Sequence, residues 1–340
     1  MQKALLVCYV SSKTGIGHLS RLLALAQNLK KDKKIVPEFL ILGDIIKLDS
    51  LKEFQIHNFS FNSDFNLIIQ NILETKNFDV IIFDIYPSHK INNLCELFKK
   101  IKQHNISIIS IDSLIEHCDL LDLIWIPSFN FDCSKYTHCK SLLKSGWDTY
   151  LIQKHLKTKE WIPGSKVLIL TGGSDVLNLG KTLPTELDTV LQDNLELNWV
   201  KGPLSKEPLL PKKPRLNWTI HDAPQRLDEL ITQSNYVISV FGISFFEVLQ
   251  YGVPAVVFSP YNNKDENDLK ALSKENVAKV VNNSKLAVEA LFKLINDDEI
   301  ASIYSINALK KMSVNGVKNL STQIYSLIKE HNVNILNRLK

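Results

Sequence analysis

An apolar, strand-like run that leads through a glycine loop into a helix occurs twice in this chain, and it limits the fold more than any other feature. Residues 4–10 are apolar, residues 11–17 form a small-residue loop, and leucine and alanine then recur at helical spacing. Residues 166–170 are again apolar and lead into the loop 171–175, with sequence TGGSD. Two such βαβ starts in 340 residues predict an α/β protein with two Rossmann-like domains facing each other across a cleft.

The remaining pattern alternates buried strands with helices, which is typical of parallel sheets covered on both faces. Further strands are expected at 36–42, 78–84, 107–112, 123–126, 217–220, 236–240 and 255–258. We therefore expect a first domain at 1–158 and a second at 159–318. Residues 319–340 are expected to form a helix, for which a return to the first domain is one placement that the sequence allows.

Charge and hydropathy exclude some partners. The net charge is +4, and the lysines are spread along the chain without interleaved aromatic residues, which disfavours a nucleic-acid surface. No apolar run is long enough to cross a bilayer. Expected thiols and no recognisable secretory signal predict a cytoplasmic protein, with a peripheral place at the inner membrane left open.

The five cysteines are expected to be thiols, because their number is odd and none form a Cys-x-x-Cys pair. Cys133, His138 and Cys139 lie close in sequence but match no known zinc spacing. We therefore expect no metal site.

The first glycine loop has the composition of an anion site. Gly15 and Gly17 allow close approach of a ligand, and the helix that follows points its backbone N–H groups at the loop. His18 adds a side chain that can exchange a proton near neutral pH. The alternative is an ordinary tight turn with a surface histidine. Asp84, Tyr86 and Asp112 fall where ligands gather in such sheets, at or just past strand ends, although caps or turns would also explain the aspartates.

The second half contains two more turns of this kind. Gly172-Gly173-Ser174 and Gly242-Ile243-Ser244 each precede a helix and offer N–H groups and a hydroxyl to a charged oxygen. Glu247 is placed either to accept a ribose hydroxyl or to act as the capping-box glutamate of its helix. Together these residues predict a nucleoside diphosphate site.

In this order, the motifs carry a family resemblance over residues 3–280. The segments 15–21 (GIGHLSR), 172–178 (GGSDVLN) and 239–254, which contains Glu247 and Gly252-Val253-Pro254, resemble the UDP-sugar hydrolases of the pseudaminic acid pathway. More broadly they are similar to GT-B glycosyltransferases, including the UDP-N-acetylglucosamine transferases of peptidoglycan synthesis.

The resemblance implies a GT-B fold whose C-terminal domain holds the nucleotide without a metal, and no Asp-x-Asp motif lies on a strand-end loop. It implies that His18 is the base acting on water, and that Asn262 or Asn263 lies near the sugar or diphosphate. Two departures weaken the hydrolase assignment. Asp112-Ser113 replaces paired aspartates, and residues 150–153 (YLIQ) lack the arginine of the hydrolase motif.

We therefore expect displacement of UDP at an anomeric carbon, with a slight preference for a UDP-sugar hydrolase. The alternative is an inverting glycosyltransferase of cell-surface glycan synthesis, with a glycan or lipid-linked acceptor. A nucleotide-sugar-binding protein without catalysis is a third class, which His18 disfavours. No cofactor is expected beyond the nucleotide sugar, which is a substrate. His18 is the predicted catalytic residue, and the predicted binding residues are Gly15, Gly17, Arg21, Asp84, Tyr86, Gly172, Gly173, Ser174, Asn178, Gly242, Ile243, Ser244, Glu247, Asn262 and Asn263.

Overall fold

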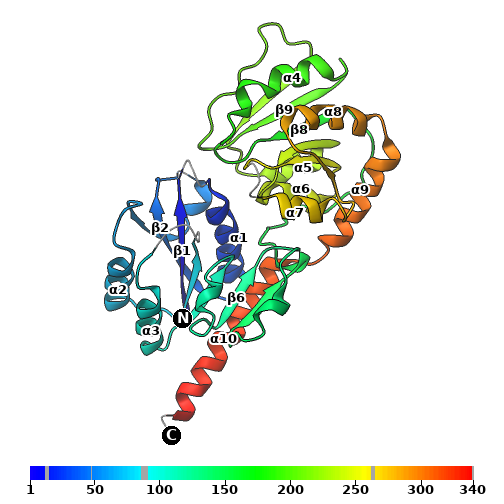
Figure 1. The fold of residues 1–340 in the computed structure, drawn as a ribbon. Helices are drawn as coiled ribbons and strands as arrows, with labels where there is room; N and C mark the ends of the chain where they lie inside the picture. The colour runs from blue at the N-terminus through cyan, green and yellow to red at the C-terminus, as the bar shows by residue number, and fades with distance from the viewer. Residues whose placement is uncertain (12–14, 47, 86–90, 262–264, 339–340) are drawn as a thin grey trace. The chain divides into compact units, whose positions relative to one another are not determined.

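The chain forms two compact units, each built around one parallel β-sheet (Figure 1). The structure is a computed structural model that describes residues 1–340 except 12–14, 47, 86–90, 262–264 and 339–340. Unit 1 comprises Met1–Gln153 and Val314–Lys340, and unit 2 comprises Lys154–Ser313. The chain therefore leaves unit 1 once and returns to it.

The sheet of unit 1 has seven strands in the order β3-β2-β1-β4-β5-β6-β7. Its register sets Lys3 beside Val36 and Cys8 beside Asp84. The order reverses direction between β1 and β4, which is where open α/β sheets bind ligands, at the carboxyl ends of the strands. The strands are β1 (Lys3–Val10), β2 (Val36–Gly43), β3 (Gln55–Phe59), β4 (Val80–Asp84), β5 (Ser107–Ile111), β6 (Leu123–Ile126) and β7 (Leu142–Ser145).

Helices cover both faces of this sheet, as the apolar strands require. On one face α1 (Gly17–Asp32) and α10 (Gly316–Arg338) pack into a single apolar cluster, in which Leu22 of α1 and Leu320 of α10 are fully buried. On the other face α2 (Phe65–Thr75) and α3 (Leu94–Gln103) contribute to a second cluster.

Unit 2 repeats this architecture with six strands in the order β10-β9-β8-β11-β12-β13. Its strands are β8 (Lys166–Leu170), β9 (Glu196–Lys201), β10 (Asn217–Asp222), β11 (Tyr236–Val240), β12 (Ala255–Phe258) and β13 (Lys279–Val280). Its helices are α4 (Leu183–Val190), α5 (Leu227–Gln233), α6 (Ile243–Tyr251), α7 (Glu266–Leu272), α8 (Ser284–Ile295) and α9 (Asp298–Lys311). The two parallel sheets confirm the predicted α/β class and its two Rossmann-like halves.

Several details differ from the sequence-based expectations, which did not include the strands Gln55–Phe59, Leu142–Ser145, Glu196–Lys201 and Lys279–Val280. The strand Gln55–Phe59 was not expected, because it is a largely exposed edge strand with little apolar signal. The expectation that all five cysteines are thiols is wrong for two of them, since Cys118 and Cys139 form a disulfide. Among the described helices, none is long and apolar enough to cross a membrane.

Candidate functional site

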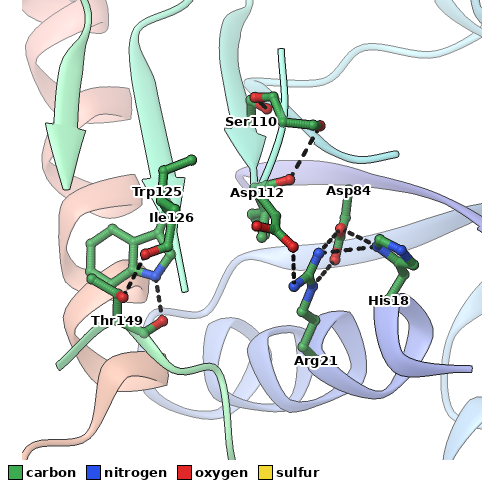
Figure 2. Close-up of polar contacts among 10 residues, drawn as sticks. His18, Arg21, Asp84, Ser110, Asp112, Trp125, Ile126 and Thr149 are labelled. Carbon is green, nitrogen blue, oxygen red and sulfur yellow. Dashed lines mark hydrogen bonds and ion pairs between the residues drawn. The ribbon is translucent and has the colours of Figure 1, made fainter. Parts of the chain in front are cut away.

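His18 and Asp84 meet at the carboxyl edge of the unit 1 sheet (Figure 2). His18 is the second residue of α1, and Asp84 is the last residue of the neighbouring β4, where its side chain is fully buried. The distance between His18 Nδ1 and Asp84 Oδ1 is 2.6 Å. The strand order therefore joins a histidine in the first turn of α1 to a carboxylate 66 residues further along the chain.

Arg21, one helical turn after His18, binds the same carboxylate. Its Nε and Nη2 donate to the two oxygens of Asp84 at 2.5 Å each, and its Nη1 donates to Asp112 at 3.0 Å. Asp112 follows β5 in a left-handed conformation (φ 65°), in a turn where Ser110 Oγ donates to the Ser113 carbonyl. Figure 2 shows Arg21 between the two carboxylates. Arg21 was predicted to bind the nucleotide sugar, but in the structure its guanidinium faces protein carboxylates.

These contacts determine the charge states of Asp84 and Arg21. Burial alone would raise the pKa of Asp84, but the charges of Arg21 and His18 and their hydrogen bonds outweigh burial and lower it. Burial opposes the charge of Arg21, but Asp84 and Asp112 raise its pKa. Both groups are therefore ionised near neutral pH.

The contacts also favour one tautomer of His18. Arg21 Nη2 lies 3.0 Å from the same Nδ1 that approaches Asp84, and Nδ1 cannot be an acceptor and a donor at once. Because the contact with the carboxylate is shorter and charge-assisted, we assign the proton to Nδ1. The lone pair then lies on Nε2, the atom that a general base uses.

The described residues leave open space around the two glycines of the first loop. Gly15 has a φ of +76°, which favours glycine, and its N–H donates to the Ser11 carbonyl at 2.8 Å. A Cβ at Gly15 or Gly17 would meet no described heavy atom within 4 Å. Crowding among the described residues therefore does not require glycine at position 17.

In unit 2 the two predicted turns follow neighbouring strands, since Leu170 of β8 pairs with Ser239 of β11. Gly172 has a φ of +85°, and a Cβ there would lie 3.6 Å from Val240. Gly202, which sequence reasoning missed, packs against this turn: a Cβ there would lie 2.5 Å from the carbonyl oxygens of Gly172 and Gly173. Only the loop conformation reveals that requirement.

The motif 172–178 also has a structural role. The Asp175 carboxylate accepts the N–H groups of Leu179 and Gly180, both at 2.9 Å. Asn178 adopts a left-handed conformation (φ 52°) at the start of the following 3₁₀ turn Leu179–Lys181. These two residues shape the loop that carries Gly173 and Ser174.

Glu247 lies beside the second turn, and the structure removes one of its two interpretations. The N-cap of α6 is Gly242, so Ser244 is already inside the helix and Glu247 is not a capping-box glutamate. Burial, followed by the charge of Asp228, raises the pKa of Glu247 to about 7. A Cβ at Gly242 would also meet no described atom within 4 Å, so the start of α6 is open.

The structure thus gathers the predicted residues into two groups and leaves three aside. Gly15, Gly17, His18, Arg21 and Asp84 lie at the carboxyl edge of the unit 1 sheet. The group in unit 2 comprises Gly172, Gly173, Ser174, Asn178, Gly242, Ile243, Ser244 and Glu247. Tyr86, Asn262 and Asn263 lie outside the described residues.

Solved structures resemble this chain, whereas the comparisons of sequence find no match. No family model and no curated protein matches the chain. MurG of Acinetobacter baumannii superimposes with a TM-score of 0.59 at 14% identity, over 97% of this chain and 100% of that one.

Two further solved structures also superimpose on nearly the whole chain. Phytolacca americana UGT2, complexed with UDP-2-fluoroglucose and pterostilbene, gives a TM-score of 0.62 at 11% identity, over 96% of this chain and 100% of that one. The spinosyn rhamnosyltransferase SpnG, complexed with thymidine diphosphate, gives a TM-score of 0.60 at 11% identity, over 95% of this chain and 100% of that one. At such identities the likeness shows the fold alone, and it shows that this chain has the GT-B fold.

Proposed function

We propose that this protein transfers a sugar from a nucleoside diphosphate to an acceptor hydroxyl by displacement at the anomeric carbon. The observation that carries the proposal is the 2.6 Å contact between His18 Nδ1 and Asp84, at the start of a GT-B fold's first helix. Proton transfer is assigned to unit 1 and nucleotide binding to unit 2.

His18 acts as the general base. Asp84 holds the proton on Nδ1, so the Nε2 lone pair accepts the proton of the acceptor hydroxyl as its oxygen attacks the anomeric carbon. The bond between that carbon and the diphosphate oxygen breaks, and its electrons leave with the diphosphate. Because Asp84 is ionised and buried, it also stabilises the imidazolium that forms.

The turns of unit 2 bind the leaving group. Backbone N–H groups at the start of α6 and in the loop of Gly173 stabilise the negative charge that grows on the diphosphate as it leaves. They do so efficiently because their dipoles need no reorganisation. Glu247 accepts a ribose hydroxyl when it is ionised. These contacts would neutralise the diphosphate without a metal ion, as the family resemblance implies.

Transfer is preferred to hydrolysis on the strength of the structural neighbours. One is named a rhamnosyltransferase, and two hold nucleoside diphosphate compounds, one of them beside a second molecule, pterostilbene. The preference for a pseudaminic-type UDP-sugar hydrolase rests on two sequence patterns, Gly-x-Gly-His-x-x-Arg at 15–21 and Gly-Gly-Ser-Asp-x-x-Asn at 172–178. Hydrolysis remains the second candidate for that reason, with water in place of a glycan or lipid-linked hydroxyl.

One assay separates the two. The protein is incubated with UDP- and dTDP-sugars, with and without a panel of acceptors, and release of the nucleoside diphosphate is measured. Release that depends on an acceptor, and that is lost in His18→Ala, supports transfer. Rapid release in water alone would assign hydrolysis. Calorimetry that detects no binding of any nucleoside diphosphate would refute both.

A further inference from the structure

Cys118, His138 and Cys139 form a cluster that the proposed reaction does not use. Cys118 follows the 3₁₀ turn Ile115–His117, and the other two residues follow the 3₁₀ turn Cys133–Tyr136. One ligand atom from each lies within 4.8 Å of the others, and His138 Nε2 is 3.9 Å from Cys139 Sγ. Two sulfurs and an imidazole nitrogen are the donors that zinc prefers.

The spacing fits a single zinc ion. With Zn–S near 2.3 Å and Zn–N near 2.1 Å, ligand atoms on a tetrahedron lie roughly 3.6 Å apart. The 3.9 Å between the Cys139 sulfur and the His138 nitrogen is close to that value. The two sulfurs, which are bonded to each other in this structure, would have to separate to a similar distance.

The charge balance also favours a divalent cation once the sulfurs are reduced. Cys118 is only 4% exposed and belongs to the apolar cluster to which α2 and α3 contribute. Cys139 packs against that cluster. Two thiolates in such surroundings are costly unless a cation neutralises them. A divalent ion cancels both charges, and a neutral imidazole adds none.

The backbone around the cluster is held by bonds other than the disulfide. Ser141 Oγ donates to the Cys118 carbonyl, and the Cys139 N–H donates to the Tyr136 carbonyl at 3.1 Å. The Tyr136 ring stacks on Phe131 at 5.4 Å. The ligands would therefore remain close together after the disulfide is reduced.

We propose that Cys118, Cys139 and His138 bind one Zn²⁺ ion when the disulfide is reduced, with water at the fourth position. Two equivalents of a small thiol reduce the disulfide, giving two cysteine thiols and one small-molecule disulfide. Zinc then displaces one proton from each thiol. Both states join the β5–β6 connection to the β6–β7 connection, so the link persists in oxidising and reducing surroundings.

The test is a zinc titration of the full chain, reduced with a phosphine that is then removed under anaerobic conditions. Native mass spectrometry should find one zinc bound to the reduced protein and none to the oxidised protein. Cobalt in place of zinc should give a thiolate-to-metal charge-transfer band. This readout does not depend on the proposed transferase activity.

Variants identify the ligands. Cys118→Ser and His138→Ala should each weaken zinc binding by more than the roughly 10–100-fold typical of an outer-sphere change. Cys95→Ser is the matched control, because Cys95 lies 3.4 Å from His117 in a neighbouring cysteine–histidine pair, and it should bind zinc like the parent. His138 is exposed, so its variant is expected to fold.

No zinc on the reduced parent chain would overturn the proposal. Equal binding by His138→Ala, or loss of binding in Cys95→Ser, would overturn the ligand assignment on which it depends.

Discussion

Replacing Arg21 by methionine should destabilise unit 1, because Asp84 would keep its charge in a buried place without its guanidinium partner. Arg21 is 9% exposed and binds both oxygens of Asp84, whose side chain is fully buried. Its third contact, with Asp112, involves a side chain that is 44% exposed. The effect should therefore come almost entirely from Asp84.

The magnitude follows from this difference in burial. Breaking a buried ion pair by removing one partner costs about 3–5 kcal/mol, whereas an exposed pair is worth about 0–1 kcal/mol. His18 remains as a partner of Asp84, which places the expected loss near the lower end, at about 3 kcal/mol at pH 7.

The loss of stability in Arg21→Met should depend on pH. The lowered pKa of Asp84 means that its stabilising contribution is present above the ordinary aspartate pKa and is lost as pH falls through the folded value. Without Arg21 the buried carboxyl takes up a proton at higher pH, which relieves the penalty. The difference between parent and variant should therefore shrink from pH 7 to pH 5.

Hydrogen-exchange mass spectrometry in a urea series is the suitable assay, because peptides of unit 1 and unit 2 report separately. Peptides of unit 2 should be unchanged. The double variant Arg21→Met/Asp84→Asn should recover much of the loss, since neither buried charge remains. A loss below about 1 kcal/mol, or one equal at both pH values, would refute the buried-pair argument.

Three further predictions concern single side chains. His18→Ala should lower turnover by about 10²–10⁴-fold while calorimetry finds nucleotide affinity retained; unchanged turnover would remove His18 from the mechanism. Nucleoside diphosphate affinity should rise with pH through about 7 as Glu247 ionises; in Glu247→Gln the rise should be smaller, because only the terminal phosphate of the ligand then titrates in this range, and calorimetry at pH 6 and pH 8 showing the parent's slope would contradict the ribose role. Glu38, whose pKa is lowered by hydrogen bonds from Lys76 and His57 against the effect of burial, should stabilise unit 1 above the ordinary glutamate pKa and lose that effect as pH falls through its folded value. Glu38→Gln should cost about 1–3 kcal/mol at pH 7 and little near pH 3, as measured by urea unfolding; a cost independent of pH would argue against the ion pair.

The sheet was predictable because its central strands are apolar on both faces. Residues 4–10 and 78–84 read as buried strands from composition alone, and the glycine loop fixes where the first helix begins. The edge strand Gln55–Phe59 has no such signal, since hydrogen bonds to β2 rather than burial define it. Local pattern thus predicts most interior strands and fails at the sheet edge, and it also fails for the interior strand Glu196–Lys201, which is only partly buried.

The site was predictable as separate residues but not as a network. His18, Arg21 and Asp84 were each chosen for their place at a loop, helix or strand end. That Arg21 joins two carboxylates 63 and 91 residues away depends on strand order, which a single sequence does not state. The N-cap of α6 is a similar case, because it is Gly242, two residues before the Ser244 that the capping-box pattern would require.

The return of α10 to unit 1 has a consequence for the order in which the chain matures. Val317, Leu320, Ile324 and Ile328 complete the apolar cluster beneath α1, so the first unit translated lacks part of its interior until residue 328 has been synthesised. Unit 2 is continuous from Lys154 to Ser313 and has all of its own side chains earlier. During synthesis, the second unit thus has its full set of side chains before the first, which still exposes apolar surface that chaperones can bind.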